Sequence, residues 1–377
     1  MKFKTIILVC LTLILFTCKD KIIITQEKDH TPKNVILLIG DGTGLSQISS
    51  AFFFKETSPN YARFKHIGLI KTSSSREDIT DSAASGTAFA CGIKTYNGAI
   101  GVADDSTDVE NLVEIISSKN IKSGLISTSS ITHATPAAFY AHNISRGSAE
   151  EIALDLAQSD VDFFAGGGTG FFNNRSDNKD LLNILKEKGF SIDTTALSDL
   201  SAIQSYSKAA YLLAEDHMPP ALKGRGDFLT KATELGIKFL SKDKDYSNFF
   251  MMVEGSQIDW GGHANDGAYL LSELIDFDDA IGKALDFAEQ DGNTLVIVTA
   301  DHETGGFTLA STPKKEENGT EYDDYSEITM TFSTNGHSAT LVPVFAYGPG
   351  AEEFIGIYEN TEIFDKILRV TKWRSEN

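Results

Sequence analysis

The sequence predicts an α/β fold, a three-layer α/β/α sandwich around a mostly parallel central sheet. Short apolar runs rich in β-branched residues recur along the chain, and segments of helical periodicity lie between them. That alternation is typical of parallel strands joined by helices that cover both faces of a sheet. We find no internal repeat and no change of composition large enough to mark a second domain.

Each predicted strand is a run short enough to be buried on both faces. These runs are residues 34–40, 123–128, 249–253, 294–299 and 341–346. The helical spacing of apolar residues predicts helices within 108–119, 149–159, 179–189 and 266–290. Residues 310–334 are rich in Lys, Glu, Asp and Tyr and interrupt the alternation, so we interpret them as a small polar surface excursion.

The N-terminal residues predict export. Residues 1–17 join a short basic start to an apolar run too short to span a bilayer, which is typical of a signal peptide. Leu15 to Cys18 resemble a bacterial lipoprotein cleavage box with Cys18 as the lipidated residue, although Phe16 is unusual there. An ordinary signal peptide with a chance cysteine is the alternative. We expect a polar tether over 18–33 and a single domain over 34–377, in a periplasmic, outer-membrane or cell-surface lipoprotein of a bacterium.

The chain is strongly acidic, which limits its partners. Its formal net charge is −20, and loss of residues 1–17 removes two lysines and no acid, which gives about −22. Such a charge repels nucleic-acid backbones and anionic lipid, so we expect no nucleic-acid partner and a membrane link only through the lipid anchor. Any bound phosphate then needs local cations. After cleavage Cys91 is left as a free thiol, so the domain must fold without disulfides.

Acidic and imidazole side chains follow the predicted strands. In open parallel sheets ligands bind beyond the carboxyl ends of the strands. Those ends carry Asp41, then Glu254, Asp259 and His263, then Asp301 and His302, while His337 precedes the last predicted strand. Carboxylates and imidazoles beside glycines suit a divalent cation. Because Gly261 and Gly262 argue against a regular helix, we expect a loop that wraps the ion between Asp259 and His263.

Taken singly, each cluster also has an ordinary structural interpretation. Asp41-Gly42 is compatible with a plain turn, and His302 with a capping or core histidine. Four such clusters are hard to explain by folding alone, because unpaired buried acids are costly without a cation. The sequence therefore predicts a metal site at one edge of the sheet.

A separate feature is the stretch of small residues from Thr80 to Thr87, TDSAASGT. A serine at the start of a short helix with small neighbours is exposed and close to backbone N–H groups that favour an anion. Ser82 is thus a candidate nucleophile for phosphate. The alternative is a serine that caps a tightly packed helix.

An ordered series of motifs resembles that of the alkaline phosphatase family. The series reads D41-G-T-G44, T80-DSAASGTA88, K94-TYNGAIGV102, H133-ATPAA138, R146, E254-GSQIDWGGH263, D301-HETGG306 and N335-GHSAT340. It is collinear and runs from residue 34 to about residue 350. The resemblance implies the sandwich fold inferred above and a hydrolase that splits phosphate monoesters through a phosphoserine.

The resemblance also implies roles for single residues. Ser82 would be the nucleophile, and Arg146, positioned by Asp81, would grip two phosphate oxygens; alone, Arg146 would be taken for a solvated surface charge. Three metal ions are implied, with these ligands: one zinc at Asp259, His263 and His337, a second zinc at Asp41, Asp301 and His302, and magnesium at Asp41, Thr135 and Glu254. His30, His66, His142 and His217 match no ligand position, and we take them as structural or solvated.

Two positions near these ligands vary within the family, where some members carry Asp and Lys. Here they are His133 and Trp260. We expect His133 to weaken magnesium binding and the Trp260 ring to lie near His133 and to leave phosphate more weakly held. The alternative is that both side chains only pack the cavity wall.

Other functions remain open from the sequence. A sulfatase needs a Cys or Ser in a C/S-x-P/A-x-R context, and the residues after Ser82 have no arginine there. A phosphodiesterase would usually lack Arg146. An inactive metal- or phosphate-binding lipoprotein would need a lost nucleophile or ligand, whereas each motif position is filled. We therefore expect phosphate monoesters as substrates, with the natural ester and a homodimer left open.

Overall fold

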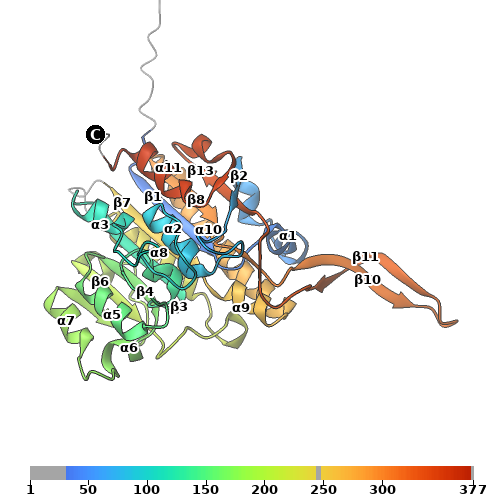
Figure 1. Cartoon of the computed structure of the whole chain (residues 1–377), viewed down its shortest axis with the longest axis horizontal. Helices are drawn as coiled ribbons and strands as arrows, with labels where there is room; N and C mark the ends of the chain where they lie inside the picture. Colours follow the sequence, from blue (N-terminus) through green and yellow to red (C-terminus); the bar gives the residue numbers. More distant parts are fainter. Residues whose placement is uncertain (1–30, 243–247, 375–377) are drawn as a thin grey trace, which may run out of the picture. The chain divides into compact units, whose positions relative to one another are not determined.

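The apolar runs form a large central sheet in the computed structural model, which describes residues 31–242 and 248–374 (Figure 1). Its strands are β1 (Asn34–Gly40), β2 (His66–Lys71), β3 (Lys122–Ser130), β4 (Phe163–Gly167), β5 (Phe190–Asp193), β6 (Lys208–Leu212), β7 (Phe249–Gly255), β8 (Thr294–Thr299), β13 (Val342–Tyr347) and β14 (Gly356–Glu359). Their order is β14-β2-β13-β8-β1-β7-β3-β4-β6-β5. Neighbours are parallel except where β13 pairs with β2 and β8.

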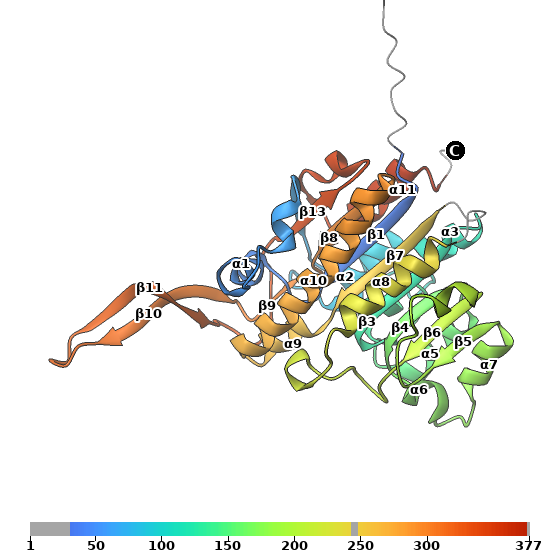
Figure 2. The ribbon, with the colours of Figure 1, turned by 180° about the vertical axis from the view of Figure 1, so that it is seen from behind.

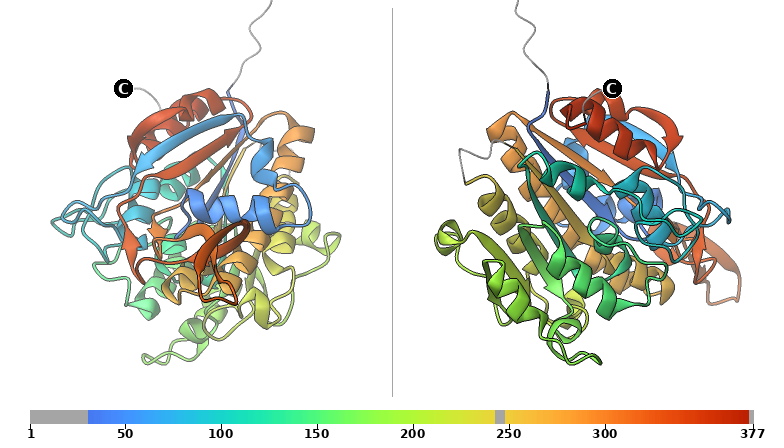
Figure 3. Two further views of the ribbon diagram at one scale, coloured as in Figure 1. Left: turned by 90° about the vertical axis from the view of Figure 1, so that its right-hand side faces the viewer. Right: turned by 60° about the vertical axis from the view of Figure 1, so that its left-hand side comes forward.

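Helices cover both faces of this sheet (Figures 2 and 3). They are α1 (Leu45–Phe54), α2 (Ser82–Cys91), α3 (Leu112–Ser117), α4 (Ala134–Ala137), α5 (Ala149–Gln158), α6 (Gly170–Asn173), α7 (Leu181–Glu187), α8 (Phe228–Leu240), α9 (Gln257–His263), α10 (Gly267–Asp291) and α11 (Glu362–Thr371). α10 begins at the cap Asp266, whose carboxylate accepts from the N–H groups of Ala268 and Tyr269, and it ends at Gly292 in the left-handed region.

The sheet separates two hydrophobic cores. Side chains alternate along β1, so that Val35, Leu37 and Ile39 join the core under α2, α3, α5 and α11, whereas Ile36 and Leu38 join the core under α8 and α10. All five side chains are fully buried. Burial on both faces explains why the strand reads as a continuous apolar run instead of an alternating one.

The predicted fold class is confirmed. Each of the five predicted strands and each of the four predicted helical segments is present, with bounds shifted by a few residues. The sequence pattern missed β2, β4, β5, β6 and β14, which are short or carry polar and glycine residues. We expected residues 341–346 to form the last strand, but β14 follows the strand that they form, β13.

The interruption predicted over 310–334 is largely a β-hairpin. Strands β10 (Thr308–Lys315) and β11 (Glu321–Thr331) pair with each other in a sheet of their own, and in Figures 1 and 2 they extend away from the central sheet. Another small sheet joins β9 (Glu303–Thr304) to β12 (His337–Ser338) at the foot of this hairpin. Those two short strands matter below because they follow and contain predicted metal ligands.

The described residues, 31–242 and 248–374, belong to one compact unit. The predicted signal peptide, Cys18 and all but the last three residues of the predicted tether lie outside the described residues. Among the residues that the structure describes, no helix is long and apolar enough to cross a membrane.

Candidate active site

The predicted ligands gather at the carboxyl ends of four adjacent strands. The order β8-β1-β7-β3 puts the residues that follow these strands side by side. Asp41 follows β1, Glu254 is the last but one residue of β7, Asp301 and His302 follow β8, and the turn that carries His133 follows β3. The sheet topology thus brings together residues that are far apart in sequence.

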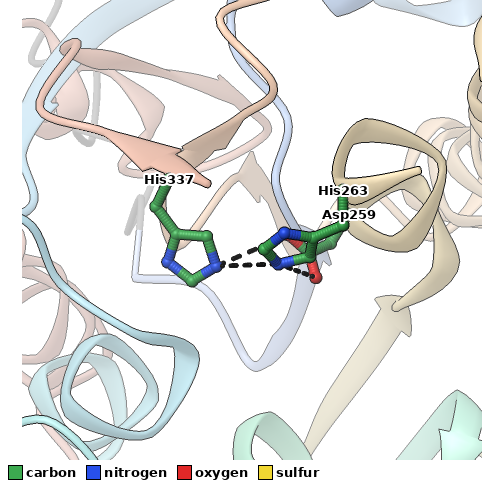
Figure 4. A group of neighbouring side chains, drawn as sticks. All are labelled: Asp259, His263 and His337. Carbon is green, nitrogen blue, oxygen red and sulfur yellow. Dashed lines mark hydrogen bonds and ion pairs between the residues drawn. The ribbon is translucent and has the colours of Figure 1, made fainter. Parts of the chain in front are cut away.

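Asp259, His263 and His337 form the first donor group (Figure 4). The His263 Nε2 atom lies 3.3 Å from Asp259 Oδ2 and 3.2 Å from His337 Nε2. The Nδ1 atom of His263 faces the Asn335 carbonyl at 2.6 Å, and that of His337 faces the Thr80 carbonyl at 2.8 Å. A ring N–H that donates to a carbonyl leaves the opposite nitrogen free for a metal, so both Nε2 atoms could bind one.

Asp41, Asp301 and His302 form the second donor group, and all three are fully buried. The His302 Nε2 atom lies 3.2 Å from Asp301 Oδ2 and 3.6 Å from Asp41 Oδ1. Burial, with Asp301 close by, raises the pKa of Asp41 well above its usual value. The ring of His302 stacks on that of His337 with centroids 3.5 Å apart, so the first and second donor groups are contiguous.

The third donor group consists of Asp41, His133 and Glu254. Glu254 is fully buried, and burial raises its pKa to about 7 although the Ser127 and Ser256 hydroxyls donate to it. Burial, followed by the charge of Arg146, lowers the pKa of His133 to about 3, so its ring is neutral. Thr135, in α4, is buried and its Oγ1 atom has no hydrogen-bond partner among the described residues.

Several buried oxygens of these groups lack a hydrogen-bond partner among the described residues. They are Asp41 Oδ1 and Oδ2, Asp301 Oδ2, Glu254 Oε1 and Thr135 Oγ1. Buried polar atoms are nearly always satisfied, and buried carboxylates need a cation or a proton. The mixed imidazole and carboxylate donors of the first two groups suit zinc, and the oxygen-rich third group suits magnesium except for its one imidazole. The residues therefore fit divalent cations.

Ser82 opens α2 and lies beside the second donor group. Its Oγ atom is 3.3 Å from His302 Nε2. The cap of α2 is Asp81, whose carboxylate accepts from the Ala84 N–H, so the alternative of a capping Ser82 was wrong. Ser82 is only 2% exposed, so the expectation of an exposed serine was also wrong. The small residues also have a packing reason, because a Cβ on Gly86 would lie 3.2 Å from Ala138.

Asp81 also holds Arg146. Its Oδ2 atom accepts from Arg146 Nη1 at 2.9 Å and from the Gly98 N–H at 3.0 Å. Although burial acts in the opposite direction, these partners and the Ala84 N–H lower the pKa of Asp81, which stays ionised. The Arg146 backbone N–H donates to the Gly98 carbonyl, and its Nη2 atom lies 3.3 Å from His133. The guanidinium is thus fixed at the edge of the site.

The segment between Asp259 and His263 is a helix, α9, and our expectation of a loop was wrong. The two predicted ligands lie one turn apart on the same face of α9, as Figure 4 shows. The two glycines are needed for close packing: a Cβ on Gly261 would lie 2.5 Å from the Leu270 backbone nitrogen, and one on Gly262 would lie 3.0 Å from Thr304. Tertiary packing outweighs the weak helix propensity of glycine here.

His133, Trp260 and His217 form an aromatic cluster next to the third donor group. The Trp260 and His133 rings meet edge to face with centroids 6.1 Å apart, while the His217 ring is closer to Trp260, at 4.7 Å. The Nδ1 atom of His217 accepts from the Ser130 backbone N–H. Trp260 is therefore near His133, and His217 belongs to the wall of the site.

His142 supports the loop that carries Arg146. Its Nε2 atom lies 3.0 Å from Glu114 Oε1 and its Nδ1 atom 2.7 Å from the Gly101 carbonyl. The bond with Glu114 raises the pKa of His142 to about 9 from the ordinary 6.5. A neutral ring would turn a lone pair toward one of these acceptors, so the protonated form is preferred.

We expect His142→Gln to destabilise the protein in a pH-dependent way. A raised pKa contributes stability below the unfolded value near 6.5, and this contribution is lost as pH rises through about 9. After allowance for solvent screening, we expect about 1–2 kcal/mol at pH 6 and no difference above pH 10. Urea unfolding of both proteins at the two pH values measures this.

His66→Gln serves as the control for the substitution itself, because His66 forms no ion pair with a described residue. A His142→Gln effect of equal size at pH 6 and pH 10 would contradict the interpretation.

Two buried residues close to the ligands were missed by the sequence reading. Thr304 Oγ1 donates to Asp259 Oδ1 at 2.5 Å and lies 3.2 Å from His302 Nδ1, so one hydroxyl joins the first and second donor groups. Glu303 is only 4% exposed, and its carboxylate accepts hydrogen bonds from Gln47, Phe307 and Ser338. Both stand in the D301-HETGG306 motif, where we considered only Asp301 and His302 as functional.

Comparison with known proteins agrees with this geometry. A family model described as alkaline phosphatase matches residues 32–315 and 308–373. The chain belongs to the alkaline phosphatase family. Alkaline phosphatase 3 of Bacillus subtilis is 33% identical over 90% of this chain and 89% of its own length. Alkaline phosphatase of Escherichia coli is 30% identical over 89% of this chain and 85% of its own length.

The chain also resembles solved alkaline phosphatases in three-dimensional structure. Alkaline phosphatase from the Antarctic bacterium TAB5 is 67% identical, with a TM-score of 0.89 over 92% of this chain and 99% of the solved one. A variant of the TAB5 enzyme with one histidine replaced by aspartate, solved with Mg in its M3 site, has the same TM-score at 68% identity. As an alkaline phosphatase family member, the chain is a phosphoric monoester hydrolase.

Proposed function

We propose that the protein hydrolyses phosphate monoesters through a phosphoserine at Ser82, in a centre that holds two zinc ions and one magnesium ion. The observation that carries the proposal is the position of Ser82 Oγ, at the start of α2 and 3.3 Å from a ligand nitrogen of the second donor group. Unpartnered backbone N–H groups at a helix start favour the anionic phosphoryl group there.

The donor groups indicate where the ions would sit. Asp259, His263 and His337 would hold one zinc, and Asp41, Asp301 and His302 the other. Asp41, Thr135 and Glu254 would hold magnesium. When bound, the ions supply positive charge that lowers the pKa of a hydroxyl and stabilises the entering and leaving oxygens of an in-line displacement.

The chain's own residues perform the remaining tasks. The Ser82 hydroxyl attacks phosphorus and releases the alcohol, and water then hydrolyses the phosphoserine to inorganic phosphate. Arg146 donates two parallel N–H groups to non-bridging oxygens, and Asp81 keeps the guanidinium in place in both steps. A diester offers fewer anionic oxygens to this arginine, which favours monoesters.

A colorimetric comparison of p-nitrophenyl phosphate, bis(p-nitrophenyl) phosphate and p-nitrophenyl sulfate tests the proposal. We expect the monoester to be hydrolysed with a kcat/KM at least about a hundredfold above the other two, because differential transition-state binding at Arg146 decides the preference. A higher value for the diester or for the sulfate would favour the alternative enzymes of the superfamily. If none of the three substrates is hydrolysed, the alternative of an inactive metal- or phosphate-binding lipoprotein would be favoured.

His133 and Trp260 should tune the third site and product release. The neutral His133 ring supplies nitrogen where magnesium prefers oxygen, and Trp260 has no charge to hold phosphate. The magnesium in the M3 site of the TAB5 aspartate variant supports the same idea for this chain.

We expect His133→Asp to lower the Mg²⁺ concentration for half-maximal activity by about 10- to 100-fold, and Trp260→Lys to lower the inhibition constant for phosphate. Titrations of both variants with Mg²⁺ and with phosphate measure the two constants. A change below twofold in both would show that these side chains only pack the wall.

We also propose that the protein is a homodimer. Phe52 and Phe53 on α1 are 51% and 62% exposed, and Tyr325 on the hairpin is 87% exposed. A two-stranded hairpin is marginally stable alone in water, so β10–β11 needs a surface to pack on, and a second copy would bring one. Light scattering should give a molar mass twice that of one chain. In the Phe53→Glu variant the measured mass should fall toward that of a single chain. A single-chain mass for the wild type would refute the dimer.

For the subcellular localisation, we propose that the protein is an exported lipoprotein anchored at Cys18. That residue lies outside the described residues, so the proposal rests on the sequence. Cys18→Ser should move the protein from the membrane fraction to the soluble fraction with its specific activity preserved. A wild type that is already soluble would leave a conventional signal peptide.

A further inference from the structure

The Glu303 carboxylate lies at the junction of three ligand-bearing segments. Its Oε1 atom accepts from Gln47 Nε2 at 2.7 Å and from the Phe307 backbone N–H at 3.0 Å. Its Oε2 atom accepts from the Ser338 hydroxyl. Gln47 and Glu303 are buried, so these bonds are protected from water.

Each donor belongs to a different segment of the site. Gln47 stands in the first turn of α1, just after the loop that begins with Asp41. Phe307 follows the turn after β9. Ser338 is paired with Glu303 across β9 and β12, next to the pair formed by His337 and Thr304.

The arrangement uses the alternation of β9. Thr304 faces the donor groups, where it contacts Asp259 and His302, whereas Glu303 faces the opposite side. Gln47 reinforces the junction, since its Nε2 atom also donates to the Thr304 carbonyl at 2.9 Å and its Oε1 atom accepts from the Gly44 N–H. A Cβ on Gly44 would lie 2.7 Å from Glu303 Cγ, so the loop approaches as closely as glycine permits.

We propose that Glu303 is a positioning residue of the two-metal site. Its carboxylate fixes the loop of Asp41, the strand after Asp301 and His302, and the strand of His337 relative to one another. This inference rests on the proposed function, because it assumes that the first and second donor groups bind metal. Partners that orient ligands contribute strongly to metal affinity even when they touch no ion.

Three variants and a control test the proposal, with Co²⁺ added to the chelated protein as the probe. Glu303→Ala removes all three links. Glu303→Gln keeps them, because its oxygen can accept both N–H groups while its amide donates to the Ser338 oxygen. Of the three links, Ser338→Ala removes the one to the His337 strand, together with the bond from Ser338 to the Thr340 hydroxyl. Glu321→Ala, on the exposed hairpin, is the matched control.

We expect Glu303→Ala to weaken Co²⁺ binding at both sites by about 10- to 100-fold and to change the visible absorption bands of the bound ion. Glu303→Gln should restore wild-type affinity and spectrum to within about threefold, and Ser338→Ala should weaken one of two sites. If Glu303→Ala does not fold, Ser338→Ala decides. Wild-type affinity and spectrum in Glu303→Ala, or in Ser338→Ala where only that variant folds, would overturn the inference. A wild type that binds no Co²⁺ would instead contradict the proposed function.

Discussion

Replacement of Ser82 by alanine is expected to lower kcat by about a thousandfold or more and to abolish phosphoenzyme formation. The Ser82 hydroxyl is the group that would form the covalent bond to phosphorus, and it lies 3.3 Å from His302 without belonging to any donor group. Metal content should therefore stay unchanged. Rapid-quench trapping of labelled protein measures the phosphoenzyme, and plasma mass spectrometry measures the metals.

The residual rate of this variant should come from the metals and from positioning by Arg146. Ser49→Ala is the control, because Ser49 is half-buried on α1 and its hydroxyl donates to the Leu45 carbonyl within the same helix. An unchanged kcat in Ser82→Ala would remove the nucleophile assignment. Loss of metal together with activity would make Ser82 a ligand instead.

Chelation is expected to abolish activity and to lower the midpoint of thermal unfolding, and Zn²⁺ with Mg²⁺ should restore both. Asp41, Asp301 and Glu254 are fully buried and carry oxygens without hydrogen-bond partners among the described residues. Without cations their negative charges repel one another, and any ion that binds only the folded state adds stability. Calorimetry and the monoester assay before and after exhaustive EDTA dialysis measure the two effects.

EDTA already saturated with zinc is the control, and it should change neither quantity. Full activity in dialysed protein that contains no metal by mass spectrometry would refute the metal-dependent mechanism. The second readout is independent of catalysis, so it tests the donor groups even in the Ser82→Ala variant.

The parts of the fold that the sequence revealed are those that packing makes unambiguous. β1, β7 and β8 are buried on both faces and read as continuous apolar runs, whereas β5 and β14 are short edge strands whose side chains are partly exposed. α9 was missed because the low helix propensity of Gly261 and Gly262 argues against a helix. The close packing against Leu270 and Thr304 that requires these glycines cannot be seen in the sequence.

The residues of the candidate site also divide into those that the sequence revealed and those that it did not. Ligand types at strand ends were visible because carboxylates and imidazoles are chemically conspicuous there. Thr304 and Glu303 were not, because a threonine and a glutamate acquire their importance from hydrogen bonds to residues far away in the chain. The edge-to-face contact of His217 with Trp260 was equally invisible, since it joins two segments that only the fold brings together.

The central place of β1 determines when catalysis can begin in the life of the polypeptide. β1 leaves the ribosome early, yet both of its partners come much later, because Asn34 pairs with Phe249 on one side and Thr294 on the other. Such long-range parallel pairing folds slowly, and a nascent chain that stops before β8 cannot assemble a reaction centre. The three donor groups can therefore assemble only after His337, near the end of the chain, has been synthesised.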